Sequence, residues 1–225
     1  MLVSLMSGFK ASVQAEPDGF FAHLANQADP VRKASAQAFS KARKQLSHRA
    51  FALLNSRLLA LVAGHLETPR WQGLRVVAAD ASKLRLHLKD ISRRFVREAS
   101  AFALYLPGLE MTLSYQLYDA SVGERQMLSG HLDKLAPDDL LVLDRGYPAR
   151  WLVALLAQRG IRFCMRVDQT GFAAVRGFLR SGAAERTVTV GPPKAIDCTD
   201  YGCRREASAV RLGSGSWPPM GGFMC

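Results

Sequence analysis

Two aspartates of this chain, Asp80 and Asp144, each follow a short, mostly apolar run and could together support metal-dependent chemistry. Residues 140–143 read Leu-Leu-Val-Leu and precede Asp-Arg-Gly-Tyr-Pro, a pattern typical of a buried strand that enters a sharp turn. Carboxylates at strand ends lie where open α/β sheets place their active sites. Two facing aspartates repel each other unless a cation intervenes. Oxygen-only ligands favour Mg²⁺ or Mn²⁺, which suit phosphodiester cleavage. The alternative is that each aspartate only stabilises a turn or caps a helix.

A mixed sheet is needed to bring the two aspartates together. Hydrophobic periodicity and turn residues predict strands at 74–80, 100–106, 111–119, 140–144 and 161–167, with helices at 122–135 and 148–159. The first three strands can form an antiparallel meander, and the last two, which alternate with helices, should be parallel. We therefore predict an α/β fold: a ribonuclease H-like mixed sheet with flanking helices, preceded by a helical N-terminal region. In it, the strands that end at Asp80 and Asp144 are neighbours.

Other residues near these aspartates are candidates for contact with a substrate. Arg145 could clamp a phosphate or only pair with the preceding aspartate. Tyr147 could stack on a base or pack under the turn. Ser82 and Lys83 could touch a nucleic acid backbone or form a short polar turn. Asp119 also ends a strand and is a rival metal ligand, although an edge strand would hold it farther away.

The charge of the chain favours a polyanionic partner. Lys and Arg number 30 against 19 Asp and Glu, for a formal net charge of +11. Residues 29–63 are predicted to be helical, with Asp29 as the cap and Pro30 at the first position. This stretch is rich in cations, of which Lys41, Arg43 and Lys44 are candidate phosphate contacts, although such a face can also be simply solvated.

Several classes of protein are not favoured. The four cysteines form no C-x-x-C pair, which argues against a zinc site. No apolar stretch is long enough to cross a bilayer, and the first residues lack a basic segment before an apolar one, so we expect a cytoplasmic protein. From residue 212 onward, Gly, Ser, Pro and Met dominate without periodicity. We predict a basic, candidate DNA-binding region at 1–68, a partial catalytic core at 69–180, and at 181–225 the start of an insertion followed by a disordered or frameshifted tail.

Three segments resemble the DDE transposases of bacterial insertion sequences, in the group typified by insertion sequence four. They are Ala-Asp-Ala-Ser-Lys-Leu at 79–84, Leu-Tyr-Asp-Ala-Ser-Val-Gly-Glu at 117–124, and Leu-Val-Leu-Asp-Arg-Gly-Tyr at 141–147. The resemblance implies that Asp80 and Asp144 are the first two acids of the catalytic triad. It also implies DNA cleavage and strand transfer with Mg²⁺ or Mn²⁺, DNA as the partner at element ends and target, and a possible homo-oligomer.

The third acid of that family is not found. The family pattern Tyr-x2-Arg-x3-Glu-x6-Lys matches Tyr201 and Arg204, but Ser208 stands at the Glu position and Gly215 at the Lys position. This departure predicts a truncated or frameshifted transposase with impaired catalysis. The alternatives are a DNA-binding remnant or inhibitor that does not cut, and a related nuclease of the same fold.

Overall fold

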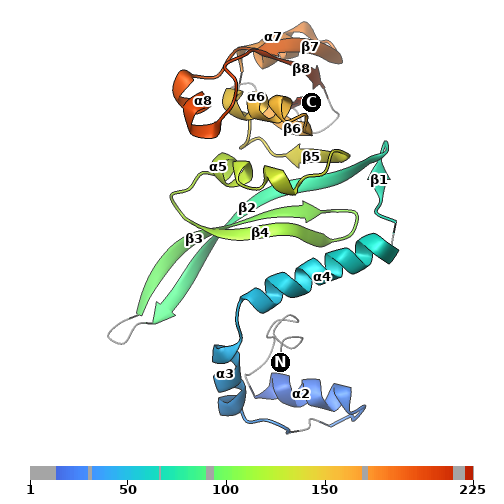
Figure 1. Ribbon diagram of the computed structural model, residues 1–225, viewed down its shortest axis with the longest axis vertical. Helices are drawn as coiled ribbons and strands as arrows, with labels where there is room; N and C mark the ends of the chain where they lie inside the picture. The colour runs from blue at the N-terminus through green and yellow to red at the C-terminus, as the bar shows by residue number, and fades with distance from the viewer. Residues whose placement is uncertain are drawn as a thin grey trace. The chain divides into compact units, whose positions relative to one another are not determined.

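The computed structural model describes residues 14–29, 32–65, 67–89, 94–168, 172–214 and 221–224. The chain forms two compact units, residues 1–60 and 61–225, so the division falls within helix α4 (Arg49–His65). The predicted boundary between residues 68 and 69 lies after that helix. Figure 1 shows the elements in chain order.

The N-terminal unit is helical, with α2 (Ala15–Leu24), α3 (Ala36–Gln45) and most of α4. Gln14 links the first two helices, because its amide nitrogen donates to Asp18 at 2.7 Å and its amide oxygen accepts from the Ala36 N–H at 2.7 Å. Ser35 caps α3 by accepting from the Ala38 N–H at 3.1 Å. The prediction of a helix starting at a cap on Asp29 is therefore wrong, and Pro30 lies outside the described residues.

The predicted helical stretch 29–63 is also interrupted between α3 and α4. Leu46 is extended, with φ −74° and ψ 118°, so it ends α3 instead of continuing it. The Ser47 hydroxyl then accepts from the Arg49 N–H at 3.3 Å, where the next helix begins. A polar break of this kind carries neither Gly nor Pro, which is why breaker residues did not reveal it.

The C-terminal unit is built on a mixed sheet with the strand order β4-β3-β2-β5-β6-β9-β8-β7. Its strands are β1 (Arg70–Trp71), β2 (Leu74–Lys89), β3 (Arg94–Leu106), β4 (Met111–Asp119), β5 (Asp139–Leu143), β6 (Arg162–Asp168), β7 (Glu185–Val190), β8 (Ser208–Gly213) and β9 (Gly221–Met224). Strands β2, β3 and β4 form an antiparallel meander, while β2, β5 and β6 are parallel. The order and directions predicted for the five strands are confirmed, and with them the ribonuclease H-like α/β class.

Two central strands are longer than the sequence predicted. The basic residues that follow Asp80 predict a turn-like stretch up to about residue 98. Pairing between β2 and β3 instead runs without a bulge from Ala78↔Tyr105 to Lys89↔Arg94, so the described residues of this stretch form a long two-stranded ribbon. Basic and apolar residues alternate in this ribbon, and the high density of positive charge is the feature that indicated a turn. Residues 90–93 lie outside the described part of the chain.

Helices lie between the later strands of the sheet in the chain order. They are α5 (Glu124–Ser129), the 3₁₀ turn η1 (Leu132–Lys134), α6 (Arg150–Gln158), α7 (Ala173–Ser181) and α8 (Ala195–Tyr201). The predicted helix 122–135 is therefore two short pieces, separated at Gly130, whose N–H closes the end of α5. Helix α5 packs on β2 and β3, and α6 packs on β6 and β8.

The region after residue 180 continues the sheet. Strand β8 pairs with both β7 and β9, and β9 pairs with β6. The predicted disordered tail is therefore wrong for residues 212–213 and 221–224, whereas 215–220 and 225 lie outside the described residues. Helix α8 is attached to α6 by the stacked rings of Trp151 and Tyr201, whose centroids lie 3.7 Å apart.

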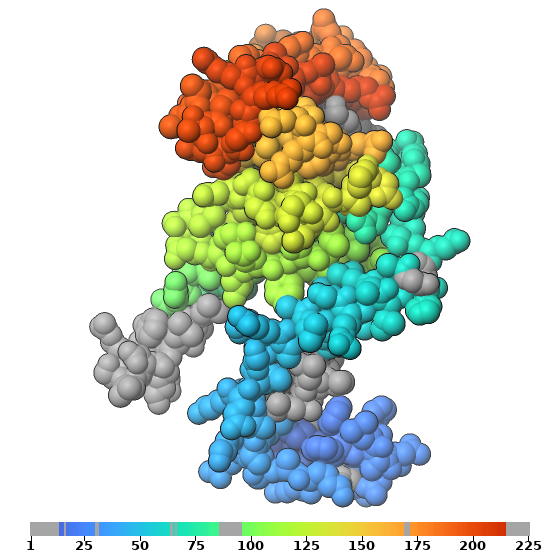
Figure 2. All heavy atoms as spheres, in the orientation of Figure 1, coloured from blue at the N-terminus to red at the C-terminus, as the bar shows by residue number. Residues whose placement is uncertain are grey.

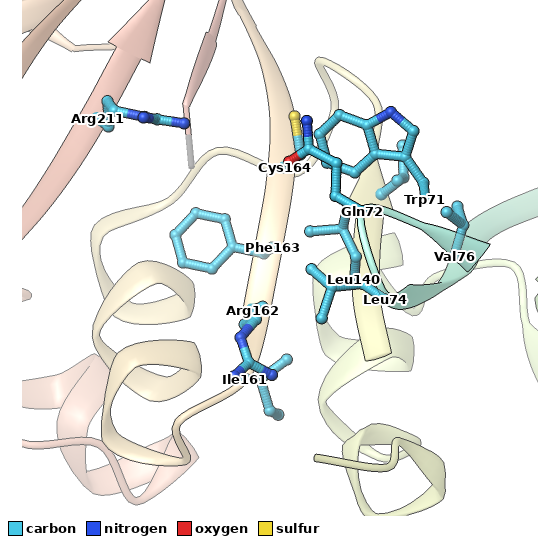
Figure 3. Close-up of a pocket in the computed structure, with 11 residues that line it drawn as sticks. Trp71, Gln72, Leu74, Val76, Leu140, Ile161, Arg162, Phe163, Cys164 and Arg211 are labelled. Carbon is cyan, nitrogen blue, oxygen red and sulfur yellow. The ribbon is translucent and has the colours of Figure 1, made fainter. Parts of the chain in front are cut away.

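The two faces of the central sheet differ in how they are covered. Val77 and Ala79 of β2 and Leu141 and Leu143 of β5 alternate with their neighbours and are at most 6% exposed. The opposite face contains a pocket of about 580 Å³, shown in Figure 3. Its lining includes Trp71, Leu74, Val76, Leu140, Val142 and Cys164.

Candidate active site

Asp80 and Asp144 lie side by side in the register of the parallel strands. The pairing of β2 with β5 runs from Arg75↔Asp139 to Ala78↔Val142, and two further steps bring Asp80 level with Asp144. Adjacent strands are about 4.8 Å apart, so the two backbones are neighbours at this level. Both aspartates are exposed. Their role as metal ligands stays a prediction.

The position of Asp80 within its strand differs from the prediction. It does not end β2, which continues to Lys89 because β3 pairs with it along that whole length. Only the parallel neighbour stops here, since β5 ends at Leu143. Asp80 therefore lies at the point where β2 is no longer paired with β5. The turn that carries Asp144 begins at the same level.

A buried ion pair fixes this register. Arg75 of β2 donates from Nε to Asp139 Oδ1 at 2.6 Å and from Nη2 to Oδ2 at 2.8 Å, and the Asp139 side chain is fully buried. Hydrogen bonding to Asp139 raises the pKa of Arg75 above its usual value, against the opposing effect of burial. Because a one-residue slip would separate these groups, the pair holds Asp80 level with Asp144.

The residues of the turn after β5 differ in how exposed they are. Its backbone closes through a hydrogen bond from the Tyr147 N–H to the Asp144 carbonyl at 3.1 Å. Arg145 is exposed, and within the described residues it forms no ion pair with Asp144, so its phosphate-clamping role stays a prediction.

Tyr147 is not available for base stacking. Its side chain is 1% exposed, so it packs under the turn, which was the alternative that the sequence left open. Its hydroxyl oxygen is fully buried and has no hydrogen-bond partner among the residues that the structure describes. Burial, and then the charges of Glu124, Asp80 and Asp144, raise the pKa of the Tyr147 hydroxyl.

Lys83 and Asp119 lie away from the aspartate pair. Lys83 is exposed but three residues beyond Asp80 on a continuous strand, so it projects from the opposite face. Asp119 pairs in register with Ala99 on the far side of β3, which puts it about 13 Å along the strands and about 10 Å across them from Asp80. Hydrogen bonds from the Ser121 N–H and hydroxyl lower the pKa of Asp119 and occupy it in a turn.

Glu124 also lies beside the site, although no role was predicted for this residue. It is the first residue of α5, is exposed, and lies so close to the Asp144 turn that a Cβ at Gly146 would be 3.1 Å from its Oε2. The Arg125 Nε also donates to the Gly146 carbonyl at 2.9 Å. A glutamate at the start of the helix between the third and fourth strands was the available signal.

The oxygen atoms of these side chains are suitable ligands for a divalent metal ion, but the side chains would have to move to bind one. Carboxylate and hydroxyl oxygens are ligands for Mg²⁺ and Mn²⁺. Within the described residues, no three His, Cys, Asp or Glu side chains already lie close enough to hold one ion. Ser208, the position of the family's third acid, begins strand β8 and lies in no helix.

The N-terminal unit, drawn in blue in the space-filling view of Figure 2, contains a second candidate surface, made by the basic residues of α3. Lys41, Arg43 and Lys44 are all exposed, and none of them makes an ion pair among the residues that the structure describes. Lys41 and Lys44 also border a shallow hollow of about 450 Å³ with Gln37 and Ser40. Contact with phosphates remains a prediction for these cations.

Comparisons with known proteins give only distant similarity. No family model matches the chain, and no curated protein matches it. A piggyBac transposase synaptic complex with hairpin DNA aligns with a TM-score of 0.38 at 9% identity, over 67% of this chain and 32% of that one. A Mos1 transposase paired-end complex aligns with a TM-score of 0.32 at 14% identity, over 72% and 56%.

A third solved structure is an endonuclease. Ciona intestinalis endonuclease V, bound to a 24mer DNA containing inosine, aligns with a TM-score of 0.30 at 10% identity, over 79% of this chain and 83% of that one. The chain spans about a third and about half of the two transposases. These scores do not assign an activity, and the insertion-sequence-four group stays a prediction. In the described residues, no helix is sufficiently long and apolar to span a bilayer.

Proposed function

We propose that this chain is a DNA transposase of the DDE type that cleaves phosphodiester bonds and transfers strands with Mg²⁺ or Mn²⁺. The observation that carries the proposal is the parallel register that brings Asp80 level with Asp144 at the end of β5. Two exposed carboxylates at this point of a mixed sheet are suited to bind a divalent ion. The net charge of +11 suits a DNA substrate.

Each residue of the site has a distinct role in this proposal. Asp80 and Asp144 hold the cation, which would activate a water or a 3′-hydroxyl and stabilise the leaving oxygen. Arg145, exposed beside Asp144, binds a phosphate of the DNA strand. Arg75 and Asp139 act at a distance, because they only keep the two aspartates in register.

Cleavage of plasmid DNA tests the proposal. Purified chain is incubated with supercoiled DNA that carries the sequence flanking its gene, in Mn²⁺, in Mg²⁺ and in EDTA. We expect metal-dependent nicking that Asp80→Asn and Asp144→Asn each reduce at least 100-fold, since each removes a charged metal ligand. Asp119→Asn is the matched control, because it neutralises an exposed aspartate outside the site. Undiminished nicking by either site variant would refute the roles of the pair.

Two other functions would give different results. A related nuclease would nick DNA but never join the new 3′ ends to a target plasmid. A non-cutting DNA-binding protein is favoured by the exposed cations of α3. It would shift element-end DNA in a gel without nicking it, and its affinity would fall steeply with salt.

A further inference from the structure

Strands β2 and β3 extend beyond the rest of the sheet as a two-stranded ribbon, residues 83–89 and 94–98. Strand β5 pairs with β2 only as far as Ala78, and β4 pairs with β3 only from Ala99 onward. Within the described residues, each strand of the ribbon is therefore paired only with the other. Figure 1 shows the ribbon leading away from the other strands. At about 3.3 Å per residue, it is roughly 20 Å long.

The two faces of this ribbon differ in charge. Residues alternate between the faces of a strand, and residues directly opposite each other share a face. The register pairs Arg85 with Glu98 and Lys89 with Arg94. One face, the basic face, therefore holds the positions of Lys83, Arg85, His87, Lys89, Arg94, Val96 and Glu98. The other face holds the positions of Leu84, Leu86, Leu88, Phe95 and Arg97.

Charged residues on an exposed ribbon have an ordinary explanation, because they discourage edge strands from pairing with other chains. That role needs charge, and acidic residues increase solubility more than basic residues do. The ribbon nevertheless has five Lys and Arg residues and a single acidic residue, Glu98. The ordinary explanation accounts for the presence of charge on the ribbon but not for its sign.

The described cations of the basic face are available to an external anion. Lys83 is exposed and forms no ion pair among the described residues. Arg85 pairs with Glu98 at 3.3 Å, but the two side chains are 77% and 59% exposed, so solvent weakens this pair. Because phosphates accept strong, charge-assisted hydrogen bonds from Arg, Arg85 loses little when it exchanges Glu98 for a phosphate.

We infer that the basic face of the ribbon binds the phosphates that border the major groove of duplex DNA. The inference rests on the proposed function and extends it, because it names an element that anchors the DNA. The major groove is about 12 Å wide and admits a two-stranded ribbon, whereas the minor groove is only about 6 Å wide. Lys83 lies on the opposite face of β2 from Asp80, so the ribbon holds DNA beside the candidate site without taking part in cleavage.

Protection of lysines by DNA tests this on the unmodified full chain. The purified protein is acetylated with an N-hydroxysuccinimide ester of acetic acid, with and without a DNA duplex at low salt, and each lysine is quantified by mass spectrometry. We expect DNA to remove most of the reactivity of Lys83 and Lys89. Lys194, an exposed lysine outside the ribbon, is the matched control and should keep its reactivity. Methyl green, which occupies the major groove, should restore the reactivity of both ribbon lysines, whereas netropsin, which occupies the minor groove, should not.

Two variants with the same change in net charge give an independent measurement. The ribbon variant carries Lys83→Gln, Arg85→Gln, Lys89→Gln and Arg94→Gln. The control variant replaces four exposed arginines elsewhere in the chain, by Arg159→Gln, Arg186→Gln, Arg204→Gln and Arg205→Gln. The slope of log K for DNA against log salt should fall by up to about 4 in the ribbon variant, since each lost phosphate contact removes about 0.9, and should hardly change in the control. Circular dichroism verifies that both variants fold, and lysine protection of the unmodified chain decides if the ribbon variant does not.

The outcomes distinguish the inference from the proposed function. If the unmodified chain binds no DNA, the proposed function itself is refuted. If the chain binds DNA but Lys83 and Lys89 remain as reactive as without it, DNA binding stands and the role of the ribbon is wrong. Equal losses of slope in the two variants would show that only net charge matters, which also overturns the inference. Restoration of lysine reactivity by netropsin instead of methyl green would overturn the choice of groove.

Discussion

Removing Arg75 should destabilise the protein far more than removing a neighbouring arginine. Arg75→Met leaves the Asp139 carboxylate buried, with its side chain fully enclosed, and removes two hydrogen bonds of 2.6 and 2.8 Å. Breaking a buried ion pair by deleting one partner costs about 3–5 kcal/mol. Arg75 is 23% exposed and Asp139 retains a hydrogen bond from the Ala136 N–H, so we expect the low end, about 3 kcal/mol.

Urea unfolding followed by circular dichroism measures this loss in the free energy of unfolding. The same change should lower Tm by roughly 6–12 °C for a protein of this size. Arg70→Met is the matched control: Arg70 pairs with Asp138 at 2.7 Å, but both side chains are about half exposed. Its loss should be small, because solvent screens such pairs.

A double variant separates loss of the ion pair from loss of packing. Arg75→Met with Asp139→Leu removes both charges, so it should recover at least half of the stability lost in Arg75→Met. Equal losses in Arg75→Met and Arg70→Met would refute the reasoning, because the buried pair would then contribute no more than the exposed one.

Three further predictions follow from single features. Burial lowers the pKa of His131, so below about pH 6.5 the unfolded state binds more protons; stability should be full above that pH and fall on acidification to 5.5. Replacing Lys41, Arg43 and Lys44 with Ala should weaken DNA binding and reduce the slope of log K against log salt by up to about 3. Tyr147→Phe without metal should raise the free energy of unfolding by up to about 1 kcal/mol, because it removes a buried hydroxyl that has no partner within the described part of the chain.

Each of these has a control and a result that contradicts it. His131→Gln should lessen the loss of stability between pH 7.5 and 5.5, and an unchanged loss would exclude His131 as its source. A DNA affinity unaffected by the α3 substitutions would exclude that helix. Arg176→Ala with Arg180→Ala on α7 is the control for net charge, since it removes two of the three positive charges lost in the α3 variant. A Tyr147→Phe variant that unfolds more easily would show that the hydroxyl has a stabilising partner.

The strand order could be predicted because its signals are local. The alternation in 111–119 indicates a strand and the apolar run before Asp144 a buried one, each within a few residues, and the handedness of crossovers then limits the topology. The alternation did not predict burial, because Tyr115 and Leu117 on its apolar face are exposed. The level positions of Asp80 and Asp144 followed from that order. The extension of β2 to Lys89 did not follow from that order. Basic residues alternate with apolar ones there, so the stretch is as rich in charge as a solvent-exposed loop.

The contact of Glu124 with Gly146 and the strands after residue 180 were missed for a different reason. The place of Glu124 beside Gly146 depends on how α5 packs, and no spacing in the sequence encodes that contact. Strands β7 to β9 are joined by long-range pairing to β6, and Gly-rich composition concealed β9. Tyr147 was left with two interpretations that only its burial resolves.

The register pair Arg75–Asp139 also sets when the candidate site can form during folding. These residues lie 64 positions apart, whereas the β2–β3 ribbon closes over a short connection. Closing a large loop costs more conformational entropy than closing a short one, and non-local pairing is correspondingly slow. The ribbon that carries Asp80 should therefore form first, and Asp144 should join it only when β5 docks. A chain still being synthesised accordingly has half of the carboxylate pair in place until β5 has left the ribosome.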